Sequence, residues 1–300
     1  MEIPAETLDF IIPELHFLIC GLILLYLAGL KDDLTGLRYR SKFIIQIFAV
    51  CMLPISGLWI NNLYGLFGIH ELSPWIGIPF TLFVAVYIIN SINLIDGLDG
   101  LASGLANLSL CILGIVSFYY ELWIYAILAF ATLGTLIPFF LYNVFGKAEH
   151  CKKIFMGDTG SLVLGYLLAF LIIRYSYCQP EIISRPEKAF IISFSTILVP
   201  VFDVCRVMLF RLRKGKHIFM ADTSHIHHKL LSIGFTPRKA MVSILGMSVV
   251  FWVTNTLLLS RLDINMLFGA DIVIWIGLNL WLDKLRDNKG SRTISGNLKK

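Results

Sequence analysis

Charged residues are scarce in this sequence. Asp, Glu, Lys and Arg make up 15% of its 300 residues, whereas hydrophobic types make up 57%. Soluble domains average about a quarter charged residues, so this composition excludes an ordinary soluble domain and indicates a membrane protein. The chain also lacks a Ser- or Pro-rich linker, a repeat at solenoid spacing and a DNA- or RNA-binding module. We therefore expect no nucleic-acid partner.

Paired cysteines and a signal peptide are missing too. No CxxC motif occurs, and most of the cysteines lie within apolar runs, which predicts buried thiols without a disulfide or metal role. They are Cys20, Cys51, Cys111, Cys151, Cys178 and Cys205. The first ten residues, MEIPAETLDF, have no basic segment and no small-residue cleavage site. The first apolar run is therefore expected to remain as a helix.

Long apolar runs fill the chain instead. A membrane-spanning helix needs about 20 apolar residues. Runs of about this length recur about nine times, at 14–30, 43–60, 76–92, 101–120, 122–142, 161–178, 188–209, 240–260 and 266–282. The sequence thus predicts an all-α fold. We expect one membrane-embedded domain over residues 1–300, a polytopic bundle of about nine transmembrane helices whose loops form the active site.

Positive charge lies on one side of these predicted spans. The loops 31–42, 93–100, 143–160, 210–239 and 283–300 share one side, and with Arg206 they carry 21 of the 25 Lys and Arg residues. Loops rich in Lys and Arg face the cytoplasm. We therefore expect the N-terminus outside, the C-terminus in the cytoplasm, and a basic inner face suited to anionic lipids and substrates.

Acidic and histidine residues gather in four of these same-side loops. They are Asp32 and Asp33 in GLKDDLTG, Asn93, Asp96 and Asp99 in NLIDGLDG, Asp158 in KIFMGDTGS, and Asp222, His225, His227 and His228 in MADTSHIHHK. Acids at the C-terminus of a helix oppose its dipole, so the Asp32–Asp33 pair needs a metal or cations such as Lys31 and Arg38. If their segment is helical, Asp96 and Asp99 share one face; packing of Gly100 and Gly104 against another helix is the structural alternative.

The other two loops also allow two interpretations each. A helix that begins near Thr159 would offer free N–H groups to an anion, or Asp158 would be only its N-cap. The three histidines suit zinc poorly, because HExxH is absent and Asp222 is the only acid nearby. Contacts with phosphate oxygens fit a basic loop better. In PVFDVCRV, Asp203 and Arg206 either pair at the end of a span or belong to the site.

Taken together, these loops predict a metal-dependent phosphate site at the inner face. Oxygen ligands from separate loops suit Mg²⁺, which binds one or two carboxylates together with substrate phosphates. Basic residues stand near the same face to neutralise phosphate charge. They are Arg206, Arg211, Arg213, Lys214 and Lys216.

The same segments resemble a known family. In order, GLKDDLTGL, NLIDGLDGLASG, KIFMGDTGSL and RLRKGKHIFMADTSHIHHKLLSIGFTPRKA are similar to the four cytoplasmic signatures of the polyprenyl-phosphate N-acetylhexosamine-1-phosphate transferases, glycosyltransferase family 4 with its WecA and MraY types. The resemblance runs from about residue 15 to the last span. HIHH and RLRKG resemble the WecA-like branch, whereas three successive histidines mark the branch that makes peptidoglycan precursors.

This resemblance implies a reaction and its location. A UDP-N-acetylhexosamine, most simply UDP-GlcNAc, donates its sugar 1-phosphate to undecaprenyl phosphate and UMP is released. The resemblance implies Mg²⁺, for which Mn²⁺ can substitute, a homodimer, and a multi-pass protein of the bacterial inner membrane with its site in the cytoplasm. The lipid phosphate attacks the β-phosphorus directly, or an aspartate first forms a covalent intermediate.

It also implies roles for individual residues. Asp158 and Asn93 are expected to bind the metal. Catalytic roles fall on Asp32 and Asp33 near the lipid phosphate, on Asp99 in the nucleotide site, and on His227 and His228 at the substrate phosphates. Substrate contacts fall on Asp96, on Asn143 and Phe155 near the uridine, and on Arg206, Arg211, Arg213, Lys214 and His225.

One departure from the family keeps other functions open. Family members have two further spans before the Asp-Asp pair and a loop with a Pro-x-x-Gly-Gly motif, and nothing here matches them. We therefore expect an N-terminally truncated chain. The alternatives are a phospho-MurNAc-pentapeptide transferase, an inactive lipid-binding homologue, a membrane transporter and a zinc-dependent membrane hydrolase. A transporter would place its acids near the middle of the membrane, whereas these acids lie at span ends.

Overall fold

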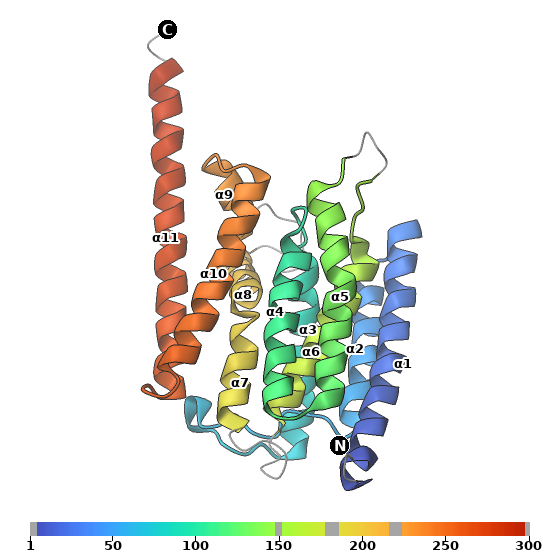
Figure 1. Cartoon of the computed structure of the whole chain (residues 1–300). Helices are drawn as coiled ribbons and strands as arrows, with labels where there is room; N and C mark the ends of the chain where they lie inside the picture. Colours follow the sequence, from blue (N-terminus) through green and yellow to red (C-terminus); the bar gives the residue numbers. More distant parts are fainter. Residues whose placement is uncertain (1–4, 148–151, 178–185, 216–223, 298–300) are drawn as a thin grey trace.

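The computed structural model describes residues 5–147, 152–177, 186–215 and 224–297. Within these ranges the chain forms a bundle of helices without a β-strand (Figure 1). The α-helices are α1 (Ala5–Thr35), α2 (Tyr39–Ile55), α3 (Pro74–Ile95), α4 (Leu101–Tyr119), α5 (Trp123–Phe145), α6 (Gly157–Ser176), α7 (Pro186–Ser195), α8 (Leu198–Arg213), α9 (Ile226–Ser232), α10 (Pro237–Leu258) and α11 (Ile264–Asn297). The all-α prediction is confirmed over this part of the chain. Cys151, Cys178, Lys216 and Asp222 lie outside it.

The predicted count of about nine spans is not confirmed. Among the described residues, seven helices are long and apolar enough to cross a membrane, or eight if the bent pair α7–α8 is one span. The apolar run at 43–60 does not form one long span, because α2, which is 17 residues long, ends at Ile55. The remainder of that run leads into a loop with one isolated bridge, between Asn62 and Glu71.

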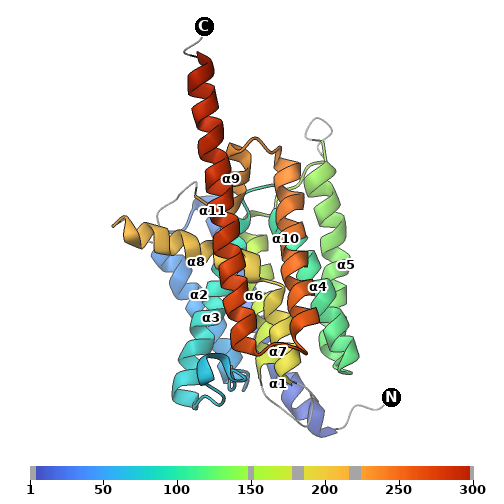
Figure 2. The same ribbon diagram turned by 90° about the vertical axis from the view of Figure 1, so that its left-hand side faces the viewer.

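The run predicted as a single helix at 188–209 is broken. α7 and α8 meet at an angle of 66° after Ser195. Side chains of this stretch bond to nearby carbonyls, since Ser193 donates to Ala189 and Thr196 donates to Ser193. Figure 2 shows the result: α8 runs sideways across the bundle while α11 stays upright. The break therefore turns α8 across α3, where the hydroxyl of Tyr87 donates to the carbonyl of Val201.

α6 is the central helix of the bundle. Its side chains from Leu167 to Ser176 are all buried. α1 approaches it closely through small residues, because a Cβ on Gly29 would lie 2.4 Å from Cα of Thr159. Such contacts let helix backbones pack tightly where lipid gives little hydrophobic driving force for association. α1 and α6 therefore hold a fixed register at the end of the bundle that carries Asp33 and Asp158.

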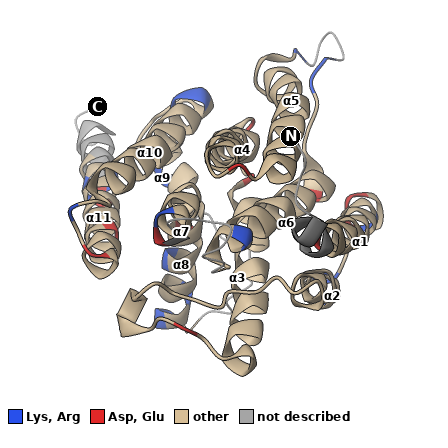
Figure 3. Cartoon of the chain, turned by 60° about the horizontal axis from the view of Figure 1, so that its bottom comes forward, with Lys and Arg blue, Asp and Glu red and all other residues tan. Residues whose placement is uncertain are grey.

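The four motif segments lie at the same end of the molecule. The upper part of Figure 1 contains all four: the end of α1, the α3–α4 turn, the start of α6, and α9. Seen from the opposite end, most of the ribbon is uncharged (Figure 3). The prediction that these four segments lie on the same side of the bundle is thus confirmed.

The cysteines differ in part from the prediction. The four described cysteines are free thiols, as expected. Cys20 and Cys205 are exposed, however, and the expectation of burial was wrong for them. An apolar residue of a membrane helix need not be in the protein core, because lipid covers the outside of the bundle.

Candidate functional site

Asp33 caps the helix that carries Asp158. Its carboxylate accepts hydrogen bonds from the Asp158 amide at 2.8 Å, the Thr159 amide at 3.1 Å and the Thr159 hydroxyl at 2.6 Å. α6 begins at Gly157, whose φ of +63° favours glycine, and a Cβ there would lie 2.7 Å from the Asp33 carboxylate. The expectations that Asp158 is the N-cap, or that these amides are free for an anion, were therefore wrong. Asp33 supplies the cap from another helix.

Because Asp33 does the capping, the Asp158 carboxylate is available for other contacts. It lies 3.0 Å from the Lys42 ammonium on α2 and accepts a 2.5 Å hydrogen bond from the Asn93 amide. The same ammonium lies 3.0 Å from Asp32 and donates to the amide oxygen of Asn93 at 3.4 Å. Asp32, Asn93 and Asp158, from three distant segments, thus converge on Lys42; we refer to these four residues as the lysine cluster.

The lysine cluster has the ligands that a hard cation prefers. Its acceptors are two carboxylates and an amide oxygen, the donor set typical of Mg²⁺ sites. That they already surround an ammonium shows that their arrangement stabilises positive charge. Within the described ranges, no group of three or more His, Cys, Asp or Glu side chains is placed to hold a metal by itself. A metal ion here would need ligands from Asn93, water or substrate.

Asp96 and Asp99 lie in the turn between α3 and α4 and not in a helix. They therefore do not share a helical face. α3 ends at Ile95 and α4 begins at Leu101. Asp99 is 41% exposed and pairs with Lys153 at 2.5 Å. Asp96 is partly buried; this burial, followed by the carboxylates of Asp158 and Asp99, raises its pKa to about 6. The two acids therefore have different surroundings, one desolvated and one at the surface.

Gly97, between these acids, lies against His227. A Cβ at this position would be 2.4 Å from Nε2 of the imidazole, which belongs to α9. His227 is 2% exposed, and its Nδ1 is buried without a hydrogen-bond partner among the described residues. Burial, followed by the charges of His228 and His225, lowers its pKa to about 4, so the ring is neutral at pH 7. The α3–α4 turn and the histidine segment are therefore in direct contact.

On the prediction that His227 contacts substrate phosphates, we expect Gly97→Ala to lower turnover by about 10²-fold, the effect of a shift near 1 Å in an active site. The added methyl group must displace the buried imidazole of His227. Gly246→Ala on α10 is the matched control, because a Cβ there meets nothing within 4 Å. Turnover and melting temperature of both purified variants are the measurements. Normal turnover of Gly97→Ala would show that the contact between the turn and His227 is unimportant.

Asp203 organises the histidine segment from α8. The fully buried carboxylate bonds to Arg206 at 2.6 Å and to Nδ1 of His225 at 2.8 Å, and it accepts the Ile226 amide. Arg206 in turn donates to the carbonyl of Ser224. Asp203 and Arg206 thus pair with each other, as one of the two interpretations predicts, and they also hold the segment of HIHH. The rings of His227 and His228 lie 4.2 Å apart between centroids.

Two residues expected near a uridine have different environments. Asn143 is buried, accepts from the Gly100 amide and donates to the carbonyl of Ile154. It therefore ties the α3–α4 turn to the segment before α6. Phe155 is 72% exposed, and the ammonium of Lys153 lies 5.4 Å from its ring centroid. An exposed ring beside an ion pair is open for stacking with a planar base.

The basic residues of α8 are not all at the site. Arg211 is buried and lines the cavity described below. Arg213 and Lys214 are exposed at the end of the helix, where the ammonium of Lys214 lies over the Phe210 ring at 4.4 Å. The structure thus places Arg206 and Arg211 near the histidines and the other two further out.

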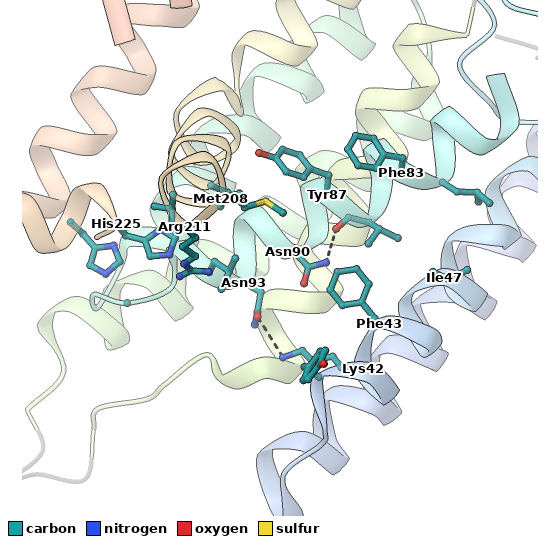
Figure 4. Close-up of a pocket in the computed structure, with 18 of the residues that line it drawn as sticks. Lys42, Phe43, Ile47, Phe83, Tyr87, Asn90, Asn93, Met208, Arg211 and His225 are labelled. Atoms are coloured by element: carbon teal, nitrogen blue, oxygen red, sulfur yellow. Dashed lines mark hydrogen bonds between the residues drawn. The ribbon is translucent and has the colours of Figure 1, made fainter. Parts of the chain in front are cut away.

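A cavity of about 740 Å³ joins these elements. Figure 4 shows Lys42 and Asn93 at one part of its wall and Arg211 and His225 at another. Its polar wall also includes Gly97, His227 and His228. Its remaining wall is largely apolar and comes from α2, α3 and α8, with Phe43, Ile47, Leu82, Phe83, Val86 and Met208. Such a cavity suits an amphiphile with an anionic head and an apolar tail.

Three residues of this region were missed by the sequence analysis or left undecided. In the sequence, Lys42 is only one of several basic residues of the loop 31–42. Lys153 precedes Phe155 without a motif that marks it. The sequence does not decide the role of Asp203, because its partner His225 is 22 residues away.

Comparisons with known proteins agree with these motifs. The sequence profile described as glycosyl transferase family 4 matches residues 15–176. Proteins named undecaprenyl-phosphate alpha-N-acetylglucosaminyl 1-phosphate transferase are similar to the chain: that of Salmonella typhi is 33% identical over 240 residues, that of Yersinia pestis 32% over 236, and that of Escherichia coli (strain K12) 31% over 240. The matches cover 78–79% of this chain and 63% of each relative, so the chain spans less than two thirds of their length.

Proposed function

The chain belongs to glycosyl transferase family 4, and we propose that it transfers GlcNAc 1-phosphate from UDP-GlcNAc to undecaprenyl phosphate with release of UMP. The names of its relatives support this acceptor and this sugar phosphate. HIHH at 225–228 supports the same branch, since the peptidoglycan branch has three successive histidines. The phospho-MurNAc-pentapeptide reaction is therefore the less favoured alternative.

The observation that supports the proposal most is the cavity between the lysine cluster and the histidine segment. An undecaprenyl phosphate has an anionic head and a long isoprenoid tail. We place its phosphate near Lys42 and Arg211 and its first isoprene units along Phe83, Val86 and Met208. Positive charge in a partly desolvated cavity stabilises an anion more than it would in water. A tail along α2, α3 and α8 would lead towards the lipid.

We place the UDP-sugar on the opposite side of the lysine cluster. The ring of Phe155 would stack on the uracil, and Lys153 would face the diphosphate from its pair with Asp99. The Nδ1 of His227 has no partner among the described residues and would bond to a phosphate oxygen, because a buried polar atom without a partner is costly. The donor and acceptor phosphates would then meet beside Asp158.

The lysine cluster fits the divalent ion that the family resemblance implies. Asp158, Asp32 and the amide oxygen of Asn93 would hold Mg²⁺ together with substrate oxygens. When bound, the ion would neutralise charge on the diphosphate. Lys42 would then turn towards the acceptor phosphate.

The protein would act mainly by positioning the two phosphates and by stabilising charge. Phosphoryl transfer needs the attacking and leaving oxygens in line, and little covalent chemistry from the protein. Asp33 would act as a positioning residue, since it fixes the start of α6 and thereby Asp158. Lys42 and Arg211 would orient the lipid phosphate towards the β-phosphorus.

We also propose how the chain lies in the membrane. With α2 as an eighth crossing and the bent pair α7–α8 as a ninth, the seven long helices give nine crossings. The basic loops would face the cytoplasm of a bacterium, and the membrane would be the inner one. The cavity would then open at the cytoplasmic side, where UDP-sugars occur.

A direct assay tests the proposed function. The purified chain is incubated with Mg²⁺, undecaprenyl phosphate and UDP-GlcNAc labelled in the sugar, with the Escherichia coli relative as positive control. We expect labelled lipid and UMP in equal amounts, and neither product without lipid. UDP-MurNAc-pentapeptide serves as the competing donor. Binding of undecaprenyl phosphate without turnover would favour the inactive homologue instead.

Removal of divalent ions should stop the reaction. We expect EDTA to lower turnover to background and added Mg²⁺ to restore it, because the carboxylates of the lysine cluster need a cation between them and the diphosphate. The restored rate should depend on Mg²⁺ concentration, with Mn²⁺ as a partial substitute. Full turnover in EDTA would contradict a role for the metal.

A further inference from the structure

Neither carboxylate of the Asp-Asp pair is free to take a proton from the acceptor phosphate. Both oxygens of Asp33 accept hydrogen bonds from the start of α6. Asp32 accepts the Leu37 amide at 2.6 Å with one oxygen and pairs with Lys42 at 3.0 Å with the other. Carboxylates held in this way are weak bases. If a proton acceptor contributes to the reaction, another group at the cavity must supply it.

His225 has the geometry of such a group. Its Nδ1 lies 2.8 Å from Oδ2 of Asp203, and the ring also lines the cavity (Figure 4). A carboxylate accepts hydrogen bonds and cannot donate them, so Nδ1 carries the hydrogen. In the neutral ring, Nε2 then carries the lone pair. His225 is 5% exposed, so packing as well as this bond holds its orientation.

Asp203 is held rigidly enough to set this orientation. It is fully buried, and its other contacts are Nη2 of Arg206 at 2.6 Å and the Ile226 amide at 3.1 Å and 3.2 Å. A buried carboxylate without such donors would be strongly destabilising. The arrangement of buried carboxylate, imidazole and cavity matches the way a carboxylate orients a catalytic histidine. It differs from the pair of Lys229 and Asp283 nearby, in which no imidazole takes part.

On the basis of the proposed function, we propose that Asp203 is a positioning residue that presents Nε2 of His225 to the phosphate of the acceptor lipid. At near-neutral pH part of this phosphate monoester carries one proton, since its second pKa is about 6. The O–H bond breaks, the proton forms an N–H bond at Nε2, and the electron pair stays on the oxygen that attacks the β-phosphorus. The Asp203 carboxylate stabilises the imidazolium. After the product leaves, the imidazolium releases the proton to water.

Among the described residues, several other charged or titratable groups lie on α8, on α9 and on the segments that contact α9. They are Asp203, Arg206 and Arg211 from α8, His227, His228 and Lys229 from α9, Asp283 from α11, and Asp96 in the turn that contacts His227. His227 is neutral at pH 7 and its Nε2 lies against Gly97. His225, in contrast, bonds through Nδ1 to a buried carboxylate, that of Asp203.

A double-mutant cycle tests this role in the full chain. We expect Asp203→Asn and His225→Ala each to lower kcat, and to lower it more at pH 6 than at pH 8, because the second pKa of the acceptor phosphate is about 6 and at pH 8 little proton transfer is needed. The double variant should be no slower than the slower single variant, because both changes remove one function. KM for UDP-GlcNAc should change less than threefold. If the kcat losses of the two single variants multiply in the double variant, the two residues do not share one role. Unchanged kcat with a higher KM for each substrate would also contradict the proposal.

Asp283→Asn is the matched control, since Asp283 also holds α9 through a basic partner, Lys229 at 2.9 Å. We expect it to keep kcat within threefold. An equal loss in this control would show that any disturbance of α9 slows the enzyme and would overturn the specific role. If Asp203→Asn does not fold, normal kcat in His225→Ala overturns the proposal by itself. A wild-type chain without transferase activity would instead refute the proposed function.

Discussion

Asp158→Asn should lower turnover by about 10³-fold and leave the fold intact, a loss typical of removing an electrostatic group from a transition state. The carboxylate of Asp158 lies 3.0 Å from the Lys42 ammonium and accepts a 2.5 Å hydrogen bond from the side-chain amide of Asn93. Its side chain is 35% exposed, and the start of α6 is capped by Asp33 instead. Asparagine keeps the shape but loses the charge. Helix formation should therefore survive while charge stabilisation is lost.

The measurement is kcat for the transfer reaction, together with the melting temperature. Asp287→Asn on α11 is the control, because this aspartate is 70% exposed and lies outside the cavity wall. We expect the control to retain wild-type turnover. A kcat of Asp158→Asn within threefold of wild type would remove Asp158 from the mechanism and with it the proposed metal site.

Lys42→Gln should lower turnover by about 10²-fold, which is the effect of one lost charge-stabilising donor in an active site. The side chain of Lys42 is 15% exposed, and its ammonium pairs with the carboxylates of both Asp32 and Asp158. Without it, the lipid phosphate at the cavity loses a positively charged partner. KM for undecaprenyl phosphate should therefore rise, while KM for UDP-GlcNAc changes less.

Lys31→Gln provides the comparison, since Lys31 is an exposed lysine near the end of α1 and not part of the cavity wall. Lys42→Arg should recover only part of the activity, because a planar guanidinium does not replace a compact ammonium among three oxygens. If Lys42→Gln and Lys31→Gln have equal rates, the ammonium has no role beyond general surface charge.

The helices could be predicted from the sequence, because an apolar run near 20 residues has few alternatives in a membrane. The break after Ser195 could not be predicted, since residues 188–209 form one apolar run and the bend depends on how α8 packs across the bundle. The short α2 was missed for a similar reason. Hydropathy records where apolar residues are, not where the backbone leaves a helix.

Part of the site could be predicted as well. That Asp33, Asn93, Asp158 and His227 lie at one end of the bundle followed from counting spans. Which of them touch did not follow, because the partners are up to 126 residues apart. An acid next to a helix start is usually its N-cap, yet here Asp33 replaces Asp158 in that role. Local rules assign the cap within a segment, whereas close packing of α1 on α6 brings in a better-placed carboxylate.

The most direct test of the account follows the β-phosphorus. The purified chain is given undecaprenyl phosphate and UDP-GlcNAc labelled with ³²P at the β-phosphate, which distinguishes transfer of a sugar phosphate from transfer of a sugar. The account predicts that the label appears in the lipid and that the released UMP is unlabelled. Label that remains in released UDP, or in intact UDP-GlcNAc while the Escherichia coli relative is active, would contradict it.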